Sequence, residues 1–187
     1  MLIAIVLTLT SPTDAILPAH LGRANYAATL AALQRMDPAL GPALHDGDGR
    51  KPLTCSSLLP EQGGPGNTRI SAGAPYYLRL TGLTPLASQA LEAVFLHNPP
   101  ATWTLADHEF TVSHICCNAD EEPWSGSTTY ETLAAAQLLQ PDHLPRRVAL
   151  LFHSPTAFQS REMHVPVPLP NLVFGSLVDR WNAFSPI

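Results

Sequence analysis

A histidine and a lysine stand six residues apart, on either side of a short polar segment that can bring them to one substrate phosphate. His45 ends a run with helical character, and Lys51 follows the acidic, glycine-rich stretch Asp46-Gly47-Asp48-Gly49. Imidazole can give or take a proton near neutral pH, because its unperturbed pKa is about 6.5. The lysine ammonium brings positive charge and three donors, which suit the shifting oxygens of a phosphoryl transition state. The pair therefore indicates chemistry at a phosphodiester.

Hydrophobic periodicity and turn residues predict the elements that position this pair. Apolar and alternating runs predict strands over 2–9, 52–59, 75–83, 101–106 and 109–117, and helical spacing predicts helices over 21–36, 38–45 and 86–97. The order strand, helix, strand, strand, helix, strand is that of a ferredoxin-like (RRM-like) α+β fold. The segment Gln62 to Asn67 lacks the lysine-threonine ending of a P-loop, so we interpret it as a connection. We expect this N-terminal domain, with the active site, to span residues 1–140.

The remaining residues predict the incomplete start of a second ferredoxin-like domain over 146–187. A helix over 129–139 and a linker over 141–145 precede a strand over 147–152 and a last helix over 172–184. The inner face of that last helix is predicted to hold Leu172, Val173, Ser176, Leu177 and Trp181. Trp181 would either anchor the helix against the strand or lie at an interface.

Composition limits the function classes. The net charge of −5 has the wrong sign for a typical nucleic-acid binder, so only a local basic patch could hold RNA. Three cysteines are an odd number, which argues against a disulfide framework and favours a reducing cytoplasm. No Lys or Arg precedes Arg23, so the apolar start predicts a buried strand rather than a signal peptide. No apolar run approaches the roughly 18 residues of a membrane span.

Histidines and cysteines near residue 114 invite a zinc interpretation. On an extended strand His114 and Cys116 share one face, whereas Cys117 takes the other, and His108 is a further candidate. Structural zinc usually has two separated ligand pairs, such as CxxC, and the sequence has none. Packing of small apolar thiols is the better explanation, so we predict no metal and no cofactor.

Several segments occur in an order that is typical of one family. They are Leu17-Pro18-Ala19-His20, Leu44-His45 through Lys51, Thr54-Cys55-Ser56, Thr129-Tyr130-Glu131-Thr132-Leu133, Ser154-Pro155-Thr156-Ala157-Phe158, Phe174-Gly175-Ser176-Leu177 and Arg180-Trp181-Asn182. Together they resemble the CRISPR-associated repeat-specific endoribonucleases of the RAMP superfamily, which cut precursor CRISPR RNA into guides. The resemblance covers the family's first domain and the opening of its second, and the family's glycine-rich C-terminal loop has no counterpart.

The resemblance implies metal-independent cleavage, in which the ribose 2′-hydroxyl attacks the adjacent phosphate and expels the 5′-oxygen. It implies that His45 is the general acid or base and that Lys51 stabilises charge. Some members add a tyrosine on the first helix. Here Leu30 occupies the aligned position, so that role is empty or is filled by His20, and Tyr26 is interpreted as a core aromatic.

The resemblance also implies partners. CRISPR repeat RNA would contact Arg50 and Arg23, although Arg50 could instead neutralise the neighbouring aspartates. Subunits of a CRISPR effector complex and a second copy of the chain are further candidate partners, and a membrane is not. Two alternatives stay open: a non-catalytic RNA-binding or scaffolding module with the same fold, and an inactive truncated product.

Overall fold

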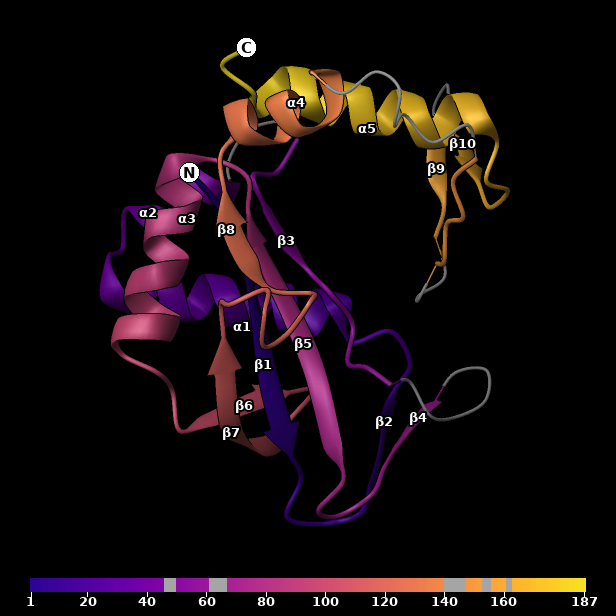
Figure 1. Cartoon of the computed structure of the whole chain (residues 1–187). Helices are drawn as coiled ribbons and strands as arrows, with labels where there is room; N and C mark the ends of the chain where they lie inside the picture. Colours follow the sequence, from indigo (N-terminus) through magenta and orange to yellow (C-terminus); the bar gives the residue numbers. More distant parts are fainter. Residues whose placement is uncertain (46–49, 61–66, 140–146, 153–155, 161–162) are drawn as a thin grey trace. The chain divides into compact units, whose positions relative to one another are not determined.

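The computed structural model describes residues 1–45, 50–60, 67–139, 147–152, 156–160 and 163–187 (Figure 1). The chain forms two units, Met1–Thr128 and Thr129–Ile187. The predicted turn over 46–49, most of the glycine-rich connection near residue 64 and the linker over 141–145 lie outside the described residues.

The first unit is built on an antiparallel sheet. Its main elements are β1 (Leu2–Thr10), α1 (Gly22–Met36), α2 (Leu40–His45), β3 (Leu53–Cys55), β5 (Pro75–Gly82), α3 (Pro85–Leu91), the π-helical turn η1 (Glu92–His97), β6 (Thr102–Leu105) and β7 (His108–Cys116). The strand order is β3-β5-β1-β7-β6, with β1 in the centre. This order confirms the predicted ferredoxin-like fold.

Three short strands of the first unit were not predicted. β2 (Ala15–Pro18) and β4 (Asn67–Ile70) pair with each other in a separate two-stranded sheet, and β8 (Gly126–Thr128) pairs with the start of β1. Each spans only three or four residues, which is too short for a period to be recognised. Conversely, the strand predicted over 52–59 is regular only as far as Cys55, and irregular bonds to β5 follow it.

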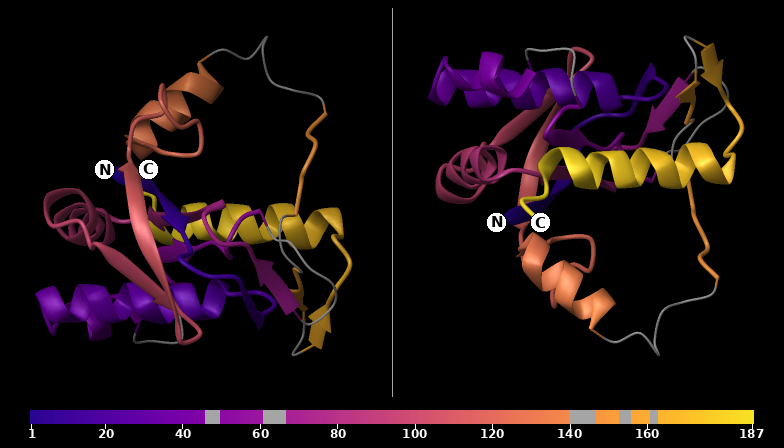
Figure 2. Two further views of the ribbon diagram at one scale, coloured as in Figure 1. Left: turned by 90° about the horizontal axis from the view of Figure 1, so that it is seen from below. Right: turned by 90° about the horizontal axis from the view of Figure 1, so that it is seen from above.

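One face of the sheet carries the hydrophobic core with the helices. Ile3, Ile5, Leu7 and Leu9 alternate along β1 and are buried with Leu78 and Leu80 of β5. Helix α1 contacts β3 and β6, whereas α3 contacts β5 and β1. Figure 1 shows α1 crossing behind the central strands, and Figure 2 shows the same elements from below and above.

A bulge changes the side of the sheet that β7 presents to the core. Leu9 opposes Val112, whereas the preceding residue Thr8 opposes His114, so Ser113 is the extra residue. Side chains alternate along a strand, and one inserted residue reverses that alternation. Val112 and Ile115 therefore both pack against the core. His114 and Cys116 consequently lie on the opposite face.

The second unit contains α4 (Tyr130–Leu138), a hairpin of β9 (Phe158–Ser160) and β10 (Met163–Val165), and α5 (Pro170–Phe184). Helix α4 groups with this unit by its contacts, and the expected N-terminal domain over residues 1–140 stays a prediction. The strand predicted over 147–152 is wrong, because these residues have no regular structure. Trp181 instead meets Tyr130 edge to face, with ring centroids 5.0 Å apart.

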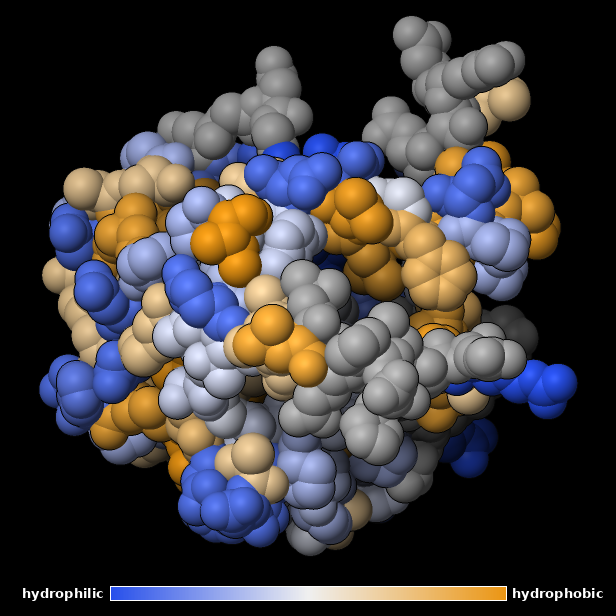
Figure 3. Space-filling view, turned by 45° about the horizontal axis from the view of Figure 1, so that its top comes forward, coloured by the Kyte–Doolittle hydropathy of each residue, from blue (hydrophilic) through white to orange (hydrophobic). Residues whose placement is uncertain are grey.

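Helix α5 confirms the predicted last helix but not its whole inner face. Val173 is buried, whereas Leu177 and the neighbouring Val178 are each 56% exposed. Figure 3 shows apolar residues interspersed among polar ones on the face that it displays. Among the described residues, no helix is long and apolar enough to cross a membrane.

Gly82 provides a test of how closely α3 packs on the sheet. A Cβ added at Gly82 would lie 2.7 Å from the backbone nitrogen of Ser88, and Ser88 donates its hydroxyl to the Gly82 carbonyl at 3.2 Å. We expect Gly82→Ala to lower the free energy of unfolding by about 1 to 3 kcal/mol, as overpacking usually does. Urea unfolding followed by circular dichroism measures this.

Gly175 of α5 provides the matched control, because among the described residues no atom beyond the helix's own nearby backbone lies within 4 Å of a Cβ added there. Gly175→Ala should leave stability unchanged or raise it by up to about 1 kcal/mol through helix propensity. Equal effects of the two substitutions would contradict the close contact at Gly82.

Candidate active site

Helix α1 is held in one rotation by a buried amide. Asn25 is fully buried, donates its side-chain N–H to the carbonyl of Ser56 at 3.0 Å, and accepts from Trp103 Nε1 at 3.2 Å. Thr29 and Leu33 continue this buried stripe at helical spacing. Because successive helical residues are turned by about 100°, Tyr26 falls at the margin of the stripe and is only half-buried.

Tyr26 meets the predicted catalytic histidine. The Tyr26 hydroxyl oxygen lies 3.4 Å from His45 Nδ1, and the two ring centroids are 5.8 Å apart. The distance is long for a hydrogen bond between a hydroxyl and a ring nitrogen. Burial, and secondarily the charge of Cys55, raise the pKa of Tyr26, so its phenol keeps its proton at neutral pH. Tyr26 is therefore placed to orient the imidazole.

Lys51 returns to the end of the helix that carries His45. Leu40, Gly41 and Leu44 bury one side of α2, and His45 is exposed at its last position. Lys51 Nζ donates to the backbone carbonyl of His45. A cation at a helix C-terminus is favourable, because the last carbonyls lack helical partners and carry partial negative charge. The structure therefore brings His45 and Lys51 together at one exposed site.

The three other predicted site residues lie on the approach to α1 and beside Lys51. Arg23 is exposed in the first turn of α1, three residues before Tyr26 and so on the same side of the helix. His20 is exposed just before the helix and has a φ of 64°. Arg50 is exposed next to Lys51. The aspartates that Arg50 could neutralise lie outside the described residues.

Tyr26 is the site residue that sequence reasoning assigned to the core. Residues 26 and 45 are 19 positions apart, and no local pattern reports their contact. A signal was nonetheless present, since Tyr26 lies next to the buried position Asn25 and four residues before Leu30, on the same helix face. The sequence left the role of the family's first-helix tyrosine empty or gave it to His20. Tyr26 is therefore a second candidate for that role.

Two protein-family models match this chain. The model of the CRISPR Cas6 N-terminal domain matches residues 1–135, and the model of the CRISPR-associated endoribonuclease Cas6 matches residues 150–187. The chain belongs to the Cas6 family. The resemblance found in the sequence is thus confirmed over most of the chain. No match is found among the curated proteins.

Solved Cas6 structures share the fold. One Cas6 product complex is 28% identical, with a TM-score of 0.63, and the match covers all of this chain and 67% of that one. A second Cas6 product complex is 25% identical, with a TM-score of 0.62 over all of this chain and 65% of the other. This Cas6 chain therefore spans about two thirds of the length of these relatives.

Cys55 lies beneath the site and provides a test of its packing against α1. Burial raises the pKa of the Cys55 thiol to about 12, although the nearby Thr29 hydroxyl, 3.6 Å from the sulfur, has a smaller opposing effect. Since the thiolate is the reactive form, a rise of about three units lowers that fraction roughly a thousandfold near neutral pH. We expect iodoacetamide to modify Cys55 far more slowly in native than in urea-unfolded protein.

Peptide mass spectrometry measures the rate of iodoacetamide modification separately for each cysteine. Cys117, which is less deeply buried than Cys55 and whose pKa is also raised by burial, is the internal comparison and should react faster than Cys55 in the native protein. If Cys55 reacted as fast as Cys117, the packing of α1 over β3 would be wrong.

Proposed function

We propose that this chain is a metal-independent endoribonuclease that cuts precursor CRISPR RNA within its repeats. Membership of the Cas6 family supports the reaction class. The observation that carries the residue assignment is the meeting of Tyr26 and His45 beside the Lys51 ammonium, on one exposed edge of the first unit.

The reaction requires two proton transfers and charge stabilisation. The 2′-oxygen forms a bond to phosphorus and loses its proton to a base, while the bond from phosphorus to the 5′-oxygen breaks and that oxygen receives a proton. The products carry a 2′,3′-cyclic phosphate and a 5′-hydroxyl. His45 serves one of the proton transfers, through the Nε2 that lies away from Tyr26. Lys51 stabilises the negative charge that develops on the phosphate oxygens.

Tyr26 acts as a positioning group for the imidazole. A phenol that donates to Nδ1 selects the tautomer whose proton is on Nε2, and this orients the ring for the reaction. His20 remains a candidate for the second proton transfer, because it precedes the helix that carries Tyr26. Arg23 and Arg50 are proposed phosphate contacts, since both are exposed and flank these groups.

The net charge of −5 opposes RNA binding both by the proposed nuclease and by the alternative, a non-catalytic RNA-binding or scaffolding module. Any RNA affinity would therefore depend on the local cations Arg23, Arg50 and Lys51. Binding to effector-complex subunits, a homodimer and a cytoplasmic location stay predictions.

The proposal predicts that His45→Ala abolishes most cleavage. We expect the single-turnover rate on labelled repeat RNA, measured in EDTA, to fall by at least about a hundredfold, the lower end for loss of a placed acid or base. His97→Ala is the matched control, because His97 is exposed at the end of η1 and is not one of the proposed site residues. It should cleave at the parent rate.

Three outcomes would overturn parts of this proposal. Equal cleavage by His45→Ala and the parent would exclude His45 as the catalyst. Cleavage only after divalent metal is added would exclude the metal-independent reaction. Salt-sensitive binding without any product would favour the non-catalytic alternative.

Tyr26→Phe tests the positioning role separately, because it keeps the ring and removes only the hydroxyl. We expect the cleavage rate to fall by about fivefold, the effect of losing a hydrogen bond of about 1 kcal/mol. RNA affinity should not change. Tyr77→Phe, at an exposed tyrosine of β5, is the matched control. An unchanged cleavage rate in Tyr26→Phe would leave Tyr26 with a packing role only.

A further inference from the structure

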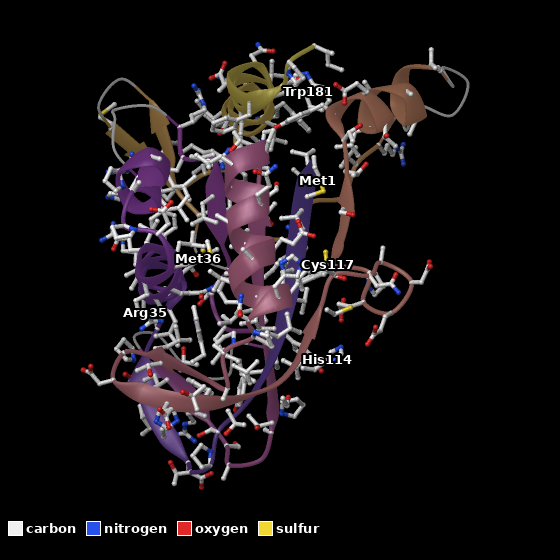
Figure 4. The ribbon with its side chains drawn as sticks, turned by 90° about the vertical axis from the view of Figure 1, so that its left-hand side faces the viewer. Met1, Arg35, Met36, His114, Cys117 and Trp181 are labelled. Atoms are coloured by element: carbon white, nitrogen blue, oxygen red, sulfur yellow. The ribbon has the colours of Figure 1, made fainter. Side chains whose placement is uncertain are left out.

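A second group of reactive side chains lies on the face of the sheet opposite the helices. His114 and Cys116 come from the end of β7, and Glu121 comes from the loop that follows it. One donor atom from each residue lies within 4.8 Å of the other two, and His114 Nε2 is 2.8 Å from a carboxylate oxygen of Glu121. Figure 4 shows His114 on the side of β7 that faces this loop.

The bulge at Ser113 is what creates this group. Without the extra residue, His114 and Cys116 would share the core side of the sheet with Val112. With it, the imidazole and the thiol both leave the core and stand on one face, two residues apart. Bulges are known to redirect side chains next to functional sites.

The loop from Asn118 to Ser125 is folded so that Glu121 returns to the strand. The backbone N–H groups of Glu121 and Glu122 both donate to the Asn118 carbonyl, at 3.1 and 2.9 Å. The Ser125 backbone N–H donates to the Glu122 carbonyl at 2.8 Å. These bonds order the loop that carries Glu121 before any ion binds. Much of the conformational entropy that binding would otherwise cost is therefore already lost in the free protein.

The sulfur of Cys116 is surrounded by groups that can stabilise a thiolate. It accepts from the Asn118 backbone N–H at 3.4 Å, and the residue is only 4% exposed. The Ser125 hydroxyl, which donates to the Glu122 carbonyl at 2.9 Å, lies 3.5 Å from the sulfur and can turn to donate to a thiolate. Donors directed at a coordinating sulfur are the usual outer shell of a metal–thiolate bond. Asp120 and Glu122 flank Glu121 and add negative charge that attracts a cation.

We propose that His114, Cys116 and Glu121 form a zinc site. One imidazole nitrogen, one thiolate and one carboxylate oxygen are donors that zinc accepts, and sulfur with imidazole disfavours magnesium and calcium. Bond lengths of about 2.0 to 2.3 Å require donor separations of about 3.5 Å, so the side chains need to move by roughly an ångström. Water would fill a fourth position, since His114 and Glu121 are both exposed.

Zinc binding replaces an existing interaction of each of the three ligands. The Cys116 thiol, which donates to the Asn118 carbonyl at 3.5 Å, releases its proton to solvent as the sulfur bonds to zinc. Both His114 and Glu121 exchange their mutual contact for a bond to the metal. The ion therefore links the loop to β7, and its role is to stabilise the first unit. This role is independent of RNA cleavage, which is tested in EDTA.

The test uses untagged full-length chain that has been stripped with a chelator. We expect it to bind one equivalent of Zn²⁺ in competition with a chromogenic chelator, with a rise in melting temperature that saturates with the metal. Co²⁺ in place of zinc should produce a thiolate-to-cobalt charge-transfer band. Glu121→Gln, at an exposed position, should weaken binding by more than about a hundredfold, beyond the usual loss for an outer-shell partner.

Two further ligand variants and their matched controls complete the test. His114→Ala should weaken binding as Glu121→Gln does, and Cys116→Ser should abolish the charge-transfer band. Asp120→Asn removes the same charge next to Glu121 and should retain tight binding, and Cys117→Ser should retain the band. The proposal is overturned if the parent binds no zinc, or if Asp120→Asn weakens binding as much as Glu121→Gln does.

Discussion

The hydrogen-bonded amide of Asn25 is the constraint on which the arrangement of the first unit depends. A fully buried amide is costly unless its groups are paired, and here it donates to the Ser56 carbonyl and accepts from the Trp103 indole. These partners belong to the segment after β3 and to β6, so the amide connects α1 to both edges of the sheet. Any rotation of α1 would break both bonds. The half-buried position of Tyr26 follows from this restriction.

The active-site candidate then depends on the short helix α2. Its buried Leu44 holds the end of the helix against the core, and the next residue, His45, projects from the surface. Lys51 caps the helix through the His45 carbonyl, which places a positive charge at the backbone of the residue that carries the imidazole. In a chain with an excess of acidic residues, this local placement matters more for a phosphate than the total charge does.

The two faces of the sheet have separate chemistry because of one inserted residue. Ser113 shifts the register of β7 against β1, and this places Ile115 in the core and His114 outside it. The zinc site proposed on that outer face shares no residue with the group around His45. Its three donors come from a strand end and an ordered loop, which is a common way for a small site to form beside a rigid scaffold.

The sequence by itself determined the elements with long periodic patterns and the family. Strand β1, helix α1 and helix α5 follow from apolar spacing, and the ferredoxin-like order follows from their succession. His45 and Lys51 were found because they are close in the chain. Where the pattern was short, it misled: residues 147–152 look like a strand, but they have no partner strand in the described structure.

Only the tertiary structure decided the contacts between distant residues. Tyr26 reaches His45 across 19 positions because α1 and α2 pack together. The helical pattern of α1 gives no information about which residue of another element lies beside the margin of its buried stripe. Glu121 joins His114 and Cys116 because a loop folds back and a bulge redirects two side chains. Local periodicity reflects burial within one element, whereas such sites depend on how separate elements are placed, and that is set by the packing of the whole core.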